Sequence, residues 1–157
     1  MSFLYETPFG VETIIKIIPH RYPMLLLDRV TLLGESTVRA EKCLTMNEGV
    51  FQGHFPNHPV YPGVLQIETM AQAGAVWILS KPENAGKIAY LMKVTEAKFR
   101  RPAVPGDRLV IEGTLSNLRS RTGQIDAQIL VDDKVISSAT IFFAFQKDAG
   151  TATAAAE

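Results

Sequence analysis

The feature that most constrains this chain is residues 64–79, which are apolar or small at nearly every position. The stretch is long enough for a helix and ends at Ser80 and Lys81-Pro82. Because a helix that is apolar all round is buried on all sides, the rest of the chain has to enclose it. Glu68 lies inside this stretch, where an ionised and unpaired carboxylate is costly.

Strand patterns follow and precede this helix. Residues 11–18 form a short amphipathic helix that Pro19 ends, and the segments that resemble strands are 24–33, 36–46, 88–101, 108–119, 123–131 and 134–146. Asp132-Asp133 has the position of a two-residue hairpin turn. The order predicts an α+β domain with about six strands, the later ones antiparallel. Since one sheet covers only one side of a helix, a second copy of the chain is expected to cover the other side.

Length and charge exclude several classes. The 157 residues fit one domain, predicted as residues 1–146, with an Ala-, Thr- and Gly-rich tail at 147–157 that is expected to be disordered. Sixteen basic and sixteen acidic residues cancel to a net charge of zero. A partner with a phosphate backbone or an anionic membrane surface would require a basic excess, so no nucleic-acid partner and no membrane insertion are expected.

The single cysteine, Cys43, cannot form an internal disulfide, and no Cys/His spacing suits zinc. Its strand-like surroundings predict an inert, half-buried thiol. No secretory signal begins the sequence, and no apolar run reaches the roughly 18 residues of a membrane span. A cytoplasmic protein without a metal is therefore expected.

Residues 53–62 place a histidine, His54, in a loop with three prolines, Pro56, Pro59 and Pro62. Each proline holds φ near about −65°, which predicts a loop that is stiff without hydrogen bonds of its own. A histidine and a carboxylate fixed beside an apolar helix suit proton transfer on an apolar substrate. Taken alone, however, a loop histidine is more often exposed or merely hydrogen-bonded.

Further motifs turn this pattern into a family resemblance. In chain order they are Pro19-His20-Arg21-Tyr22-Pro23, Leu26-Leu27-Asp28-Arg29-Val30, Gly53-His54-Phe55-Pro56, Pro62-Gly63-Val64-Leu65, Glu68-Thr69-Met70-Ala71-Gln72, Lys98-Phe99-Arg100-Arg101-Pro102 and Pro105-Gly106-Asp107. Over roughly residues 11–146 the chain resembles the FabZ-type 3-hydroxyacyl-[acyl-carrier-protein] dehydratases.

The resemblance implies a hot-dog fold, in which an antiparallel sheet wraps a long central helix. It implies homodimers with two active sites at the subunit interface, commonly assembled into hexamers as trimers of dimers, and no cofactor. The partner is acyl carrier protein, whose 3-hydroxyacyl thioester is dehydrated to the trans-2-enoyl thioester in fatty-acid elongation. The catalytic pair carried over is His54 of one subunit and Glu68 of the other.

That reaction needs a base for the C2 proton, a stabiliser for the enolate-like oxygen and an acid for the leaving hydroxyl. His54 suits the base, since its ordinary pKa of about 6.5 leaves it mostly neutral near pH 7. The family pattern assigns the Val60 carbonyl to its other ring nitrogen. Gly63 and Val64 are expected to bind the oxyanion through backbone N–H groups at the helix start. Burial is expected to raise the pKa of Glu68, so that it can donate a proton.

Three neighbouring polar residues receive lesser roles. His20 is expected to pack or cap at the turn between Pro19 and Pro23, and His58 only to precede a proline. Whether the His58-Pro59 bond is cis is left open. Gln72, one turn beyond Glu68, is expected to hydrogen-bond the Glu68 carboxyl or a backbone group.

Tunnel and docking residues are assigned more loosely. Tyr61, Leu65, Met92 and Phe99 are candidates for lining an acyl tunnel, with ordinary core packing as the equal alternative. The basic cluster formed by Lys98, Arg100 and Arg101, with Arg119 and Arg121 nearby, can dock the acidic carrier protein or form a solvated face.

Three other functions remain open. A related dehydratase–isomerase typically has Asp where this chain has Glu68, which favours the plain dehydratase. A hot-dog thioesterase fits the His54 and Glu68 pair less well. A non-catalytic acyl-binding module has no reason to bury a carboxylate. Gln66 departs from the family pattern, which commonly has an apolar residue there.

Overall fold

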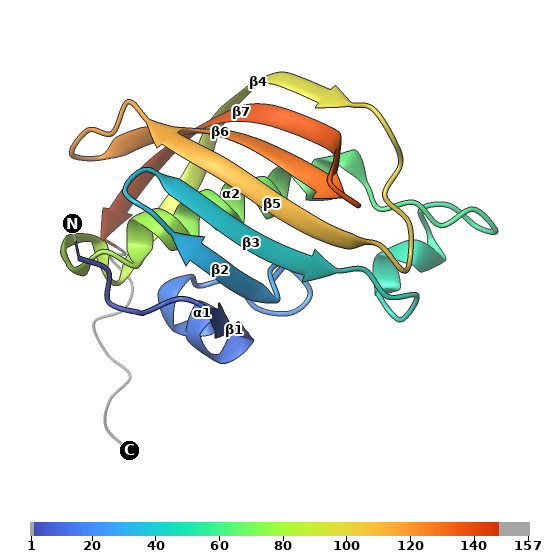
Figure 1. Cartoon of the computed structure of the whole chain (residues 1–157), viewed down its shortest axis with the longest axis horizontal. Coiled ribbons are helices and arrows are strands. Elements are labelled where there is room, and N and C mark those ends of the chain that lie inside the picture. The colour runs from blue at the N-terminus through green and yellow to red at the C-terminus, as the bar shows by residue number, and fades with distance from the viewer. Residues whose placement is uncertain (1, 148–157) are drawn as a thin grey trace.

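The computed structural model describes residues 2–147 of the chain. In this part a seven-stranded antiparallel sheet curves around one long helix, α2 (Figure 1). The sheet has the order β1-β2-β3-β5-β6-β7-β4. The helical elements are α1 (Val11–Ile17), the 3-10 turns η1 (Gly49–Gln52) and η2 (Pro82–Asn84), and α2 (Gly63–Leu79); the strands are β1 (Phe9–Gly10), β2 (Arg29–Leu33), β3 (Thr37–Cys43), β4 (Lys87–Phe99), β5 (Arg108–Ser116), β6 (Thr122–Val131) and β7 (Lys134–Lys147). This is the predicted hot-dog arrangement.

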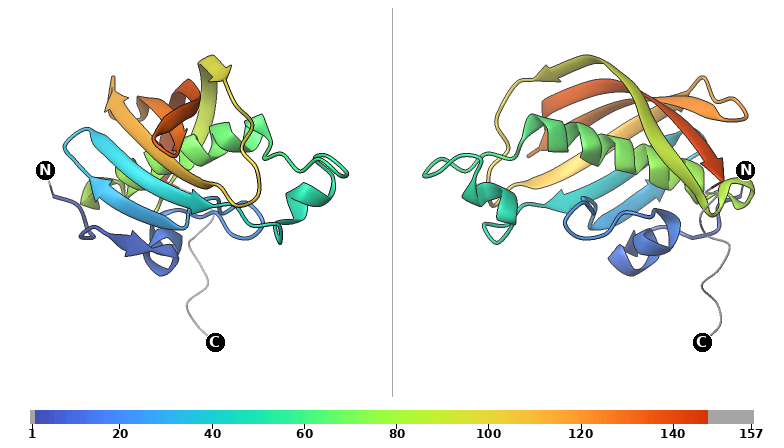
Figure 2. Two further views of the ribbon diagram at one scale, coloured as in Figure 1. Left: turned by 45° about the vertical axis from the view of Figure 1, so that its right-hand side comes forward. Right: turned by 180° about the vertical axis from the view of Figure 1, so that it is seen from behind.

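The helix α2 lies along the inner face of the curved sheet, as the view from behind shows (Figure 2). Every residue from Gln72 to Leu79 is buried, and the indole of Trp77 donates a hydrogen bond to the Gly34 carbonyl at 3.0 Å. The N-terminal half is less covered: Val64 is 74% exposed. Within one chain, burial on all sides is therefore reached only in the C-terminal half of α2.

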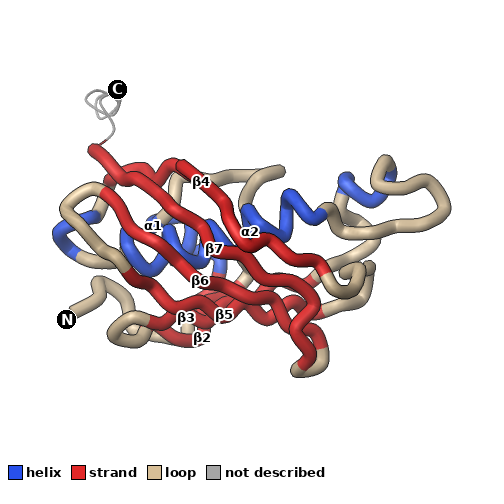
Figure 3. The backbone as a smooth tube through the Cα atoms, turned by 90° about the horizontal axis from the view of Figure 1, so that it is seen from above, coloured by secondary structure: helices blue, strands red, loops and turns tan. Residues whose placement is uncertain are grey.

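The segment that leads into α2 projects beyond the end of the sheet. Seen from above, η1 and the following loop extend past the strands, and the first turn of α2 lies at the same end (Figure 3). The strands therefore pack against the C-terminal half of α2 and leave its N-terminus accessible.

One edge of the sheet is long and unpaired in the single chain. The strand β4 pairs only with β7, and its exposed side chains include Tyr90, Leu91, Met92 and Phe99. Long exposed edges with apolar side chains are templates for pairing with another chain.

Most predicted elements are present, with shifted ends. Residues 24–28 are wrongly predicted as strand, because the Leu26 N–H and the Met24 carbonyl bond to the side chain of Gln72 instead of a neighbouring strand. The two-residue strand β1 was not expected. Lys147 belongs to β7 and not to the predicted tail, whose remaining residues, 148–157, lie outside the described part.

Two local predictions are decided by backbone and exposure. Asp132 and Asp133 have φ of 49° and 59°, and their neighbours Val131 and Lys134 are paired, so the turn between β6 and β7 forms without glycine. Positive φ at both central residues is the requirement of a type I′ hairpin.

Cys43 is exposed, so the prediction of a half-buried thiol is wrong. No helix among residues 2–147 has the length and hydropathy to cross a membrane.

Two glycines, one on α2 and one on β5, leave space for a core side chain. The buried side chain of Ile125 in β6 fills this space: a Cβ on Gly74 of α2 would lie 3.2 Å from its Cδ1. A Cβ on Gly113 of β5 would overlap the same Cδ1 and lie 3.0 Å from Cγ1. Gly74 therefore lets α2 pack closely on Ile125, and Gly113 makes room for the same side chain within the sheet.

We expect Gly113→Ala to lower the free energy of unfolding by about 1–3 kcal/mol, because the new methyl group has to displace the packed Ile125 side chain. Urea denaturation measures this change. Gly49→Ala is the matched control, since a Cβ there meets no atom within 4 Å. Equal stability of the two variants would contradict this packing.

Candidate active site

The loop before α2 is held by its own backbone. Phe55 and His58 exchange hydrogen bonds of 3.0 and 2.9 Å, and the Val60 N–H donates to the His54 carbonyl at 2.9 Å. Asn57 has a φ of 61° at the tip. The prediction of a loop without hydrogen bonds of its own is therefore wrong, since the prolines add to a hydrogen-bonded turn.

The structure also decides whether the His58-Pro59 peptide bond is cis or trans. The cis bonds of the described residues are Thr7-Pro8, Tyr22-Pro23 and His54-Phe55, so the His58-Pro59 bond is trans.

His54 has a fixed ring orientation. Its Nδ1 lies 2.8 Å from the Val60 carbonyl oxygen, the partner that the family pattern indicated, and the ring stacks on Phe55 with centroids 4.0 Å apart. A carbonyl oxygen can only accept, so Nδ1 carries the proton of the neutral ring. The other nitrogen, Nε2, is then left with a free lone pair, which is the state that a general base requires.

The start of α2 supplies unpaired backbone donors beside this histidine. The Pro62 carbonyl accepts the N–H groups of Leu65 and Gln66 at 3.0 Å, whereas those of Gly63 and Val64 have no partner among the described residues. His54 and Gly63 line one cavity of about 350 Å³. Free N–H groups and the positive end of the helix dipole favour an anionic oxygen there.

Phe99 packs closely on Gly63. A Cβ at Gly63 would lie 3.0 Å from two carbons of the Phe99 ring. Phe99 lines the His54 cavity and is half exposed, so its ring can both pack on the helix start and contact a ligand.

Glu68 occupies a different environment on the same helix. Its Oε1 accepts a hydrogen bond from the Gln72 amide at 2.8 Å and lies 3.3 Å from Nε2 of His20. Gln72 also donates to the Met24 carbonyl at 2.7 Å and accepts from the Leu26 N–H at 2.9 Å. Gln72 thus makes both contacts that the sequence left as alternatives.

The expected upward shift of the Glu68 pKa is not found in the single chain. Burial does raise the pKa, but the hydrogen bonds from His20 and Gln72, together with the charge interaction with His20, outweigh burial and hold the pKa of this carboxyl below its ordinary value. His20, which was expected to pack or cap at its turn, also contacts Glu68. In the sequence, the one hint of a fixed His20 side chain is its place between Pro19 and Pro23, and this does not identify Glu68 as the partner.

The structure does not bring His54 and Glu68 together within one chain. Glu68 lines a small cavity of about 50 Å³ with His20 and Gln72, walled mainly by apolar residues of α2, β4 and β7. The His54 cavity shares no residue with it.

The predicted tunnel residues separate into two groups. Tyr61 and Phe99 line the His54 cavity, although Tyr61 is also part of the core and its hydroxyl lies 3.3 Å from Thr69 Oγ1. Leu65 packs against the core, and Met92 lines another cavity, near the turn between β5 and β6.

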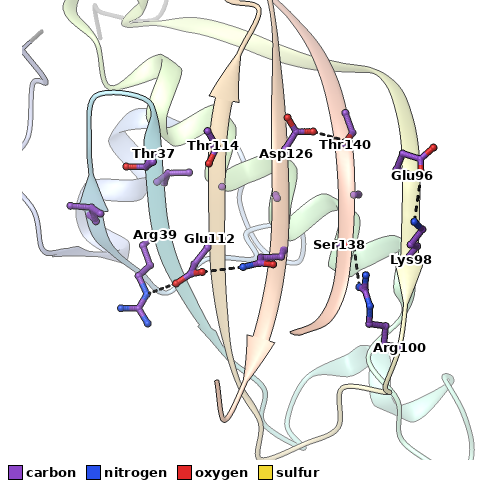
Figure 4. Close-up of a pocket in the computed structure, with 16 residues that line it drawn as sticks. Thr37, Arg39, Glu96, Lys98, Arg100, Glu112, Thr114, Asp126, Ser138 and Thr140 are labelled. Atoms are coloured by element: carbon purple, nitrogen blue, oxygen red, sulfur yellow. Dashed lines mark hydrogen bonds and ion pairs between the residues drawn. The ribbon is translucent and has the colours of Figure 1, made fainter. Parts of the chain in front are cut away.

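The residues predicted to dock the carrier protein lie on two different surfaces. Arg101 lines the His54 cavity, whereas Lys98 lies 3.6 Å from Glu96 on the outer face of the sheet. Arg100 lines both the His54 cavity and the outer hollow, and its guanidinium donates to Ser138 Oγ at 3.1 Å. This outer face holds a hollow of about 540 Å³, and Figure 4 shows its charged side chains in ion pairs and in hydrogen bonds to neighbouring hydroxyl groups. Examples are Arg39 with Glu112 at 3.5 Å and Asp126 with Thr140 at 2.6 Å. Neither His54 nor Glu68 lines this hollow, so it is not the candidate site.

Gln66 lines the His54 cavity and carries a buried polar atom without a hydrogen-bond partner among the described residues. Its amide Nε2 donates to the Tyr61 carbonyl at 3.2 Å, while its Oε1 is buried without a hydrogen-bond partner among the described residues. The family departure noted in the sequence therefore places an unsatisfied acceptor at the wall of this cavity.

Comparison with known proteins now identifies the family. The family model of the FabA-like domain matches residues 18–140. The 3-hydroxyacyl-[acyl-carrier-protein] dehydratase FabZ of Sulfurovum sp. is 45% identical over 140 residues, covering 85% of this chain and 94% of that protein. FabZ of Lactococcus lactis subsp. cremoris is 42% identical over 139 residues, covering 88% and 96%.

Solved structures support the fold. A chain of the dehydratase heterocomplex ApeI:P from Xenorhabdus doucetiae superposes with a TM-score of 0.77 at 20% identity, over 91% of this chain and 93% of that one. A mutant thioesterase from Pseudomonas aeruginosa has a TM-score of 0.66 at 14% identity, over 90% and 97%. The fold alone thus hosts more than one chemistry, whereas the sequence relatives are dehydratases. By this sequence similarity the chain belongs to the FabZ family of 3-hydroxyacyl-[acyl-carrier-protein] dehydratases.

Proposed function

We propose that this protein catalyses the reversible dehydration of 3-hydroxyacyl-[acyl-carrier-protein] to the trans-2-enoyl thioester in fatty-acid elongation, in the cytoplasm and without a cofactor. The observation that carries the proposal is one cavity lined by His54, whose Nε2 is free to accept a proton, and by Gly63. The N–H groups of Gly63 and of the next residue, Val64, have no partner among the described residues. A base beside an oxyanion site is what removal of a proton next to a thioester carbonyl requires.

In the proposed reaction, Nε2 of His54 removes the proton from C2. The electrons pass to the thioester carbonyl, whose oxygen accepts hydrogen bonds from the backbone of Gly63 and Val64. When the C3–O bond breaks, the carbonyl re-forms, the C2–C3 double bond appears and Glu68 protonates the departing hydroxyl to water. Hydration runs through the same groups in reverse, with Glu68 as base and His54 as acid.

The acid role requires Glu68 to be protonated when the C3–O bond breaks. In the single chain its side chain is 23% exposed, and burial is the largest influence that raises its pKa. A partner subunit and an acyl chain would remove more water, and so raise the pKa further toward the working range.

A homodimer accounts for the separation of the two cavities. Pairing of β4 with β4 of a second subunit would satisfy the unpaired edge and cover the apolar side chains Tyr90, Leu91 and Met92. It would also cover the exposed start of α2 at Val64. Each active site would then combine His54 of one subunit with Glu68 of the other. We further propose the hexamer, as a trimer of such dimers, from the family resemblance.

The three alternative functions can be told apart by their reaction products. Added isomerase activity would yield a 3-enoyl product, a thioesterase would release free thiol, and an acyl-binding module would show no turnover. No observation in the described residues favours any of them over the dehydratase.

We expect His54→Ala and Glu68→Gln each to lower turnover by at least about 100-fold, since each removes a proton-transfer group. The assay is hydration of crotonyl-acyl carrier protein, followed by loss of enoyl absorbance. Circular dichroism and gel filtration should show both variants folded and assembled as the wild type. Absence of turnover in folded, dimeric wild type would reject the enzyme and leave the acyl-binding module.

Subunit mixing tests the shared site. A dimer of one His54→Ala subunit and one Glu68→Gln subunit has one site with both groups intact and one with neither. If subunits exchange at random, the equal mixture should recover about one quarter of wild-type activity, because half of the dimers are mixed and half of their sites are whole. No recovery after verified exchange would mean that both groups act within one subunit.

The docking role is tested by charge reversal at two neighbouring positions. We expect Arg101→Glu to raise KM for crotonyl-acyl carrier protein on the order of tenfold, because Arg101 lies at the His54 cavity and the carrier is acidic. Lys98→Glu is the matched control, since Lys98 lies on the outer sheet face beside Glu96. Crotonyl-N-acetylcysteamine, which lacks the carrier, should be hydrated equally by both variants. An equal rise in KM for both substrates would argue for a role in the cavity itself.

A further inference from the structure

His20 contributes to the environment of Glu68 from outside the helix. Its Nε2 lies 3.3 Å from Glu68 Oε1, the same oxygen that accepts from the Gln72 amide at 2.8 Å. No hydrogen bond from residues 2–147 ends on Oε2. The carboxyl group is therefore held by one oxygen, and the other is left for a substrate.

The protonation of the His20 ring follows from its surroundings. Nδ1 is buried and has no partner within the described part of the chain. A proton on Nδ1 would be buried and unpaired, which is costly, so the proton of the neutral ring belongs on Nε2. His20 is then a hydrogen-bond donor to Glu68.

The backbone around His20 is fixed at both ends. On one side, the guanidinium of Arg21 donates to the carbonyls of Ile15, Ile18 and His20 at 2.7–3.0 Å, which ties the turn to the end of α1. On the other side, Gln72 binds the backbone at Met24 and Leu26. A turn with this support can hold a side chain to a definite place.

Few other ionisable groups surround Glu68. The small cavity around it is lined by apolar or small residues of α2, β4 and β7, with Tyr90 of β4 and His20 as the other titratable groups among the described residues. The charge of Arg21 is directed to backbone carbonyls. His20 is therefore the ionisable group that contacts the carboxylate.

We propose that His20 is a positioning residue: by donating to Oε1 it fixes the Glu68 carboxyl with Oε2 toward the 3-hydroxyl of the substrate. This rests on the proposed function of Glu68. His20 touches neither the substrate nor the reacting atoms in this role. It also opposes the effect of burial, since its hydrogen bond is among the influences that lower the Glu68 pKa.

The sign of the effect is clearest for hydration. In that direction Glu68 must be ionised to take a proton from water, so activity falls as the pH drops through the Glu68 pKa. Removing the His20 donor raises this pKa and moves the acid limb of the pH profile to higher pH.

The test compares His20→Leu, which removes the donor, with His20→Gln, whose amide nitrogen can replace Nε2. For crotonyl-acyl carrier protein hydration we expect His20→Leu to lower kcat by about tenfold, with KM within about twofold and the acid limb shifted upward. His20→Gln should recover kcat to within about threefold of the wild type. A purely structural role would not restore kcat and the acid limb together.

A second measurement does not depend on turnover. In protein labelled with ¹³C at the glutamate carboxyls, the Glu68 signal is assigned by its absence in Glu68→Gln and then titrated. We expect its pKa to be higher in His20→Leu than in the wild type, and to return toward the wild-type value in His20→Gln. Should His20→Leu fail to fold, His20→Asn, whose amide is too short to reach Glu68, takes its place.

Two outcomes would overturn the proposal. One is a Glu68 titration unchanged by loss of the donor, and the other is a His20→Gln enzyme as slow as the donor-free variant. Absence of turnover in the wild type would instead reject the proposed function, while the titration would still decide whether His20 acts on Glu68.

Discussion

The enclosure of α2 is the constraint on which the rest of the structure depends. An apolar helix cannot lie on a flat sheet with its other faces in water, so the strands curve around it, and Gly74 lets it pack closely on Ile125. The strands hold the C-terminal half, which leaves the N-terminus beyond the sheet with unpaired N–H groups. The same element is therefore the centre of the core and the start of the candidate site.

Apart from Oε1 of Gln66, the buried polar side chains of α2 have hydrogen-bond partners among the described residues. Gln72 binds the backbone at Met24 and Leu26, and this also anchors Glu68. Thr69 finds its partner locally, in the Leu65 carbonyl at 2.7 Å. The satisfaction of buried polar groups thus links the N-terminal segment, the core and the candidate acid in one network.

Local patterns could be predicted from the sequence, and contacts between distant segments could not. The helix α2, the hairpin turn at Asp132-Asp133 and the His54–Val60 contact each depend on residues near one another in the chain. The apolar residues near Leu26 were predicted as a strand, because an irregular segment buried in the core is as apolar as a buried strand. The direction of the Glu68 pKa depended on His20, which no spacing rule connects to this helix.

The edge strand β4 has a consequence for how the protein responds to concentration. Its free edge is the proposed seam between subunits, and its last residue, Phe99, packs on Gly63 at the helix start. If the seam forms the site, association and substrate binding are thermodynamically linked, and each strengthens the other by the same factor. Dilution would then weaken substrate affinity before any subunit unfolds, and saturating substrate would hold together dimers that otherwise dissociate.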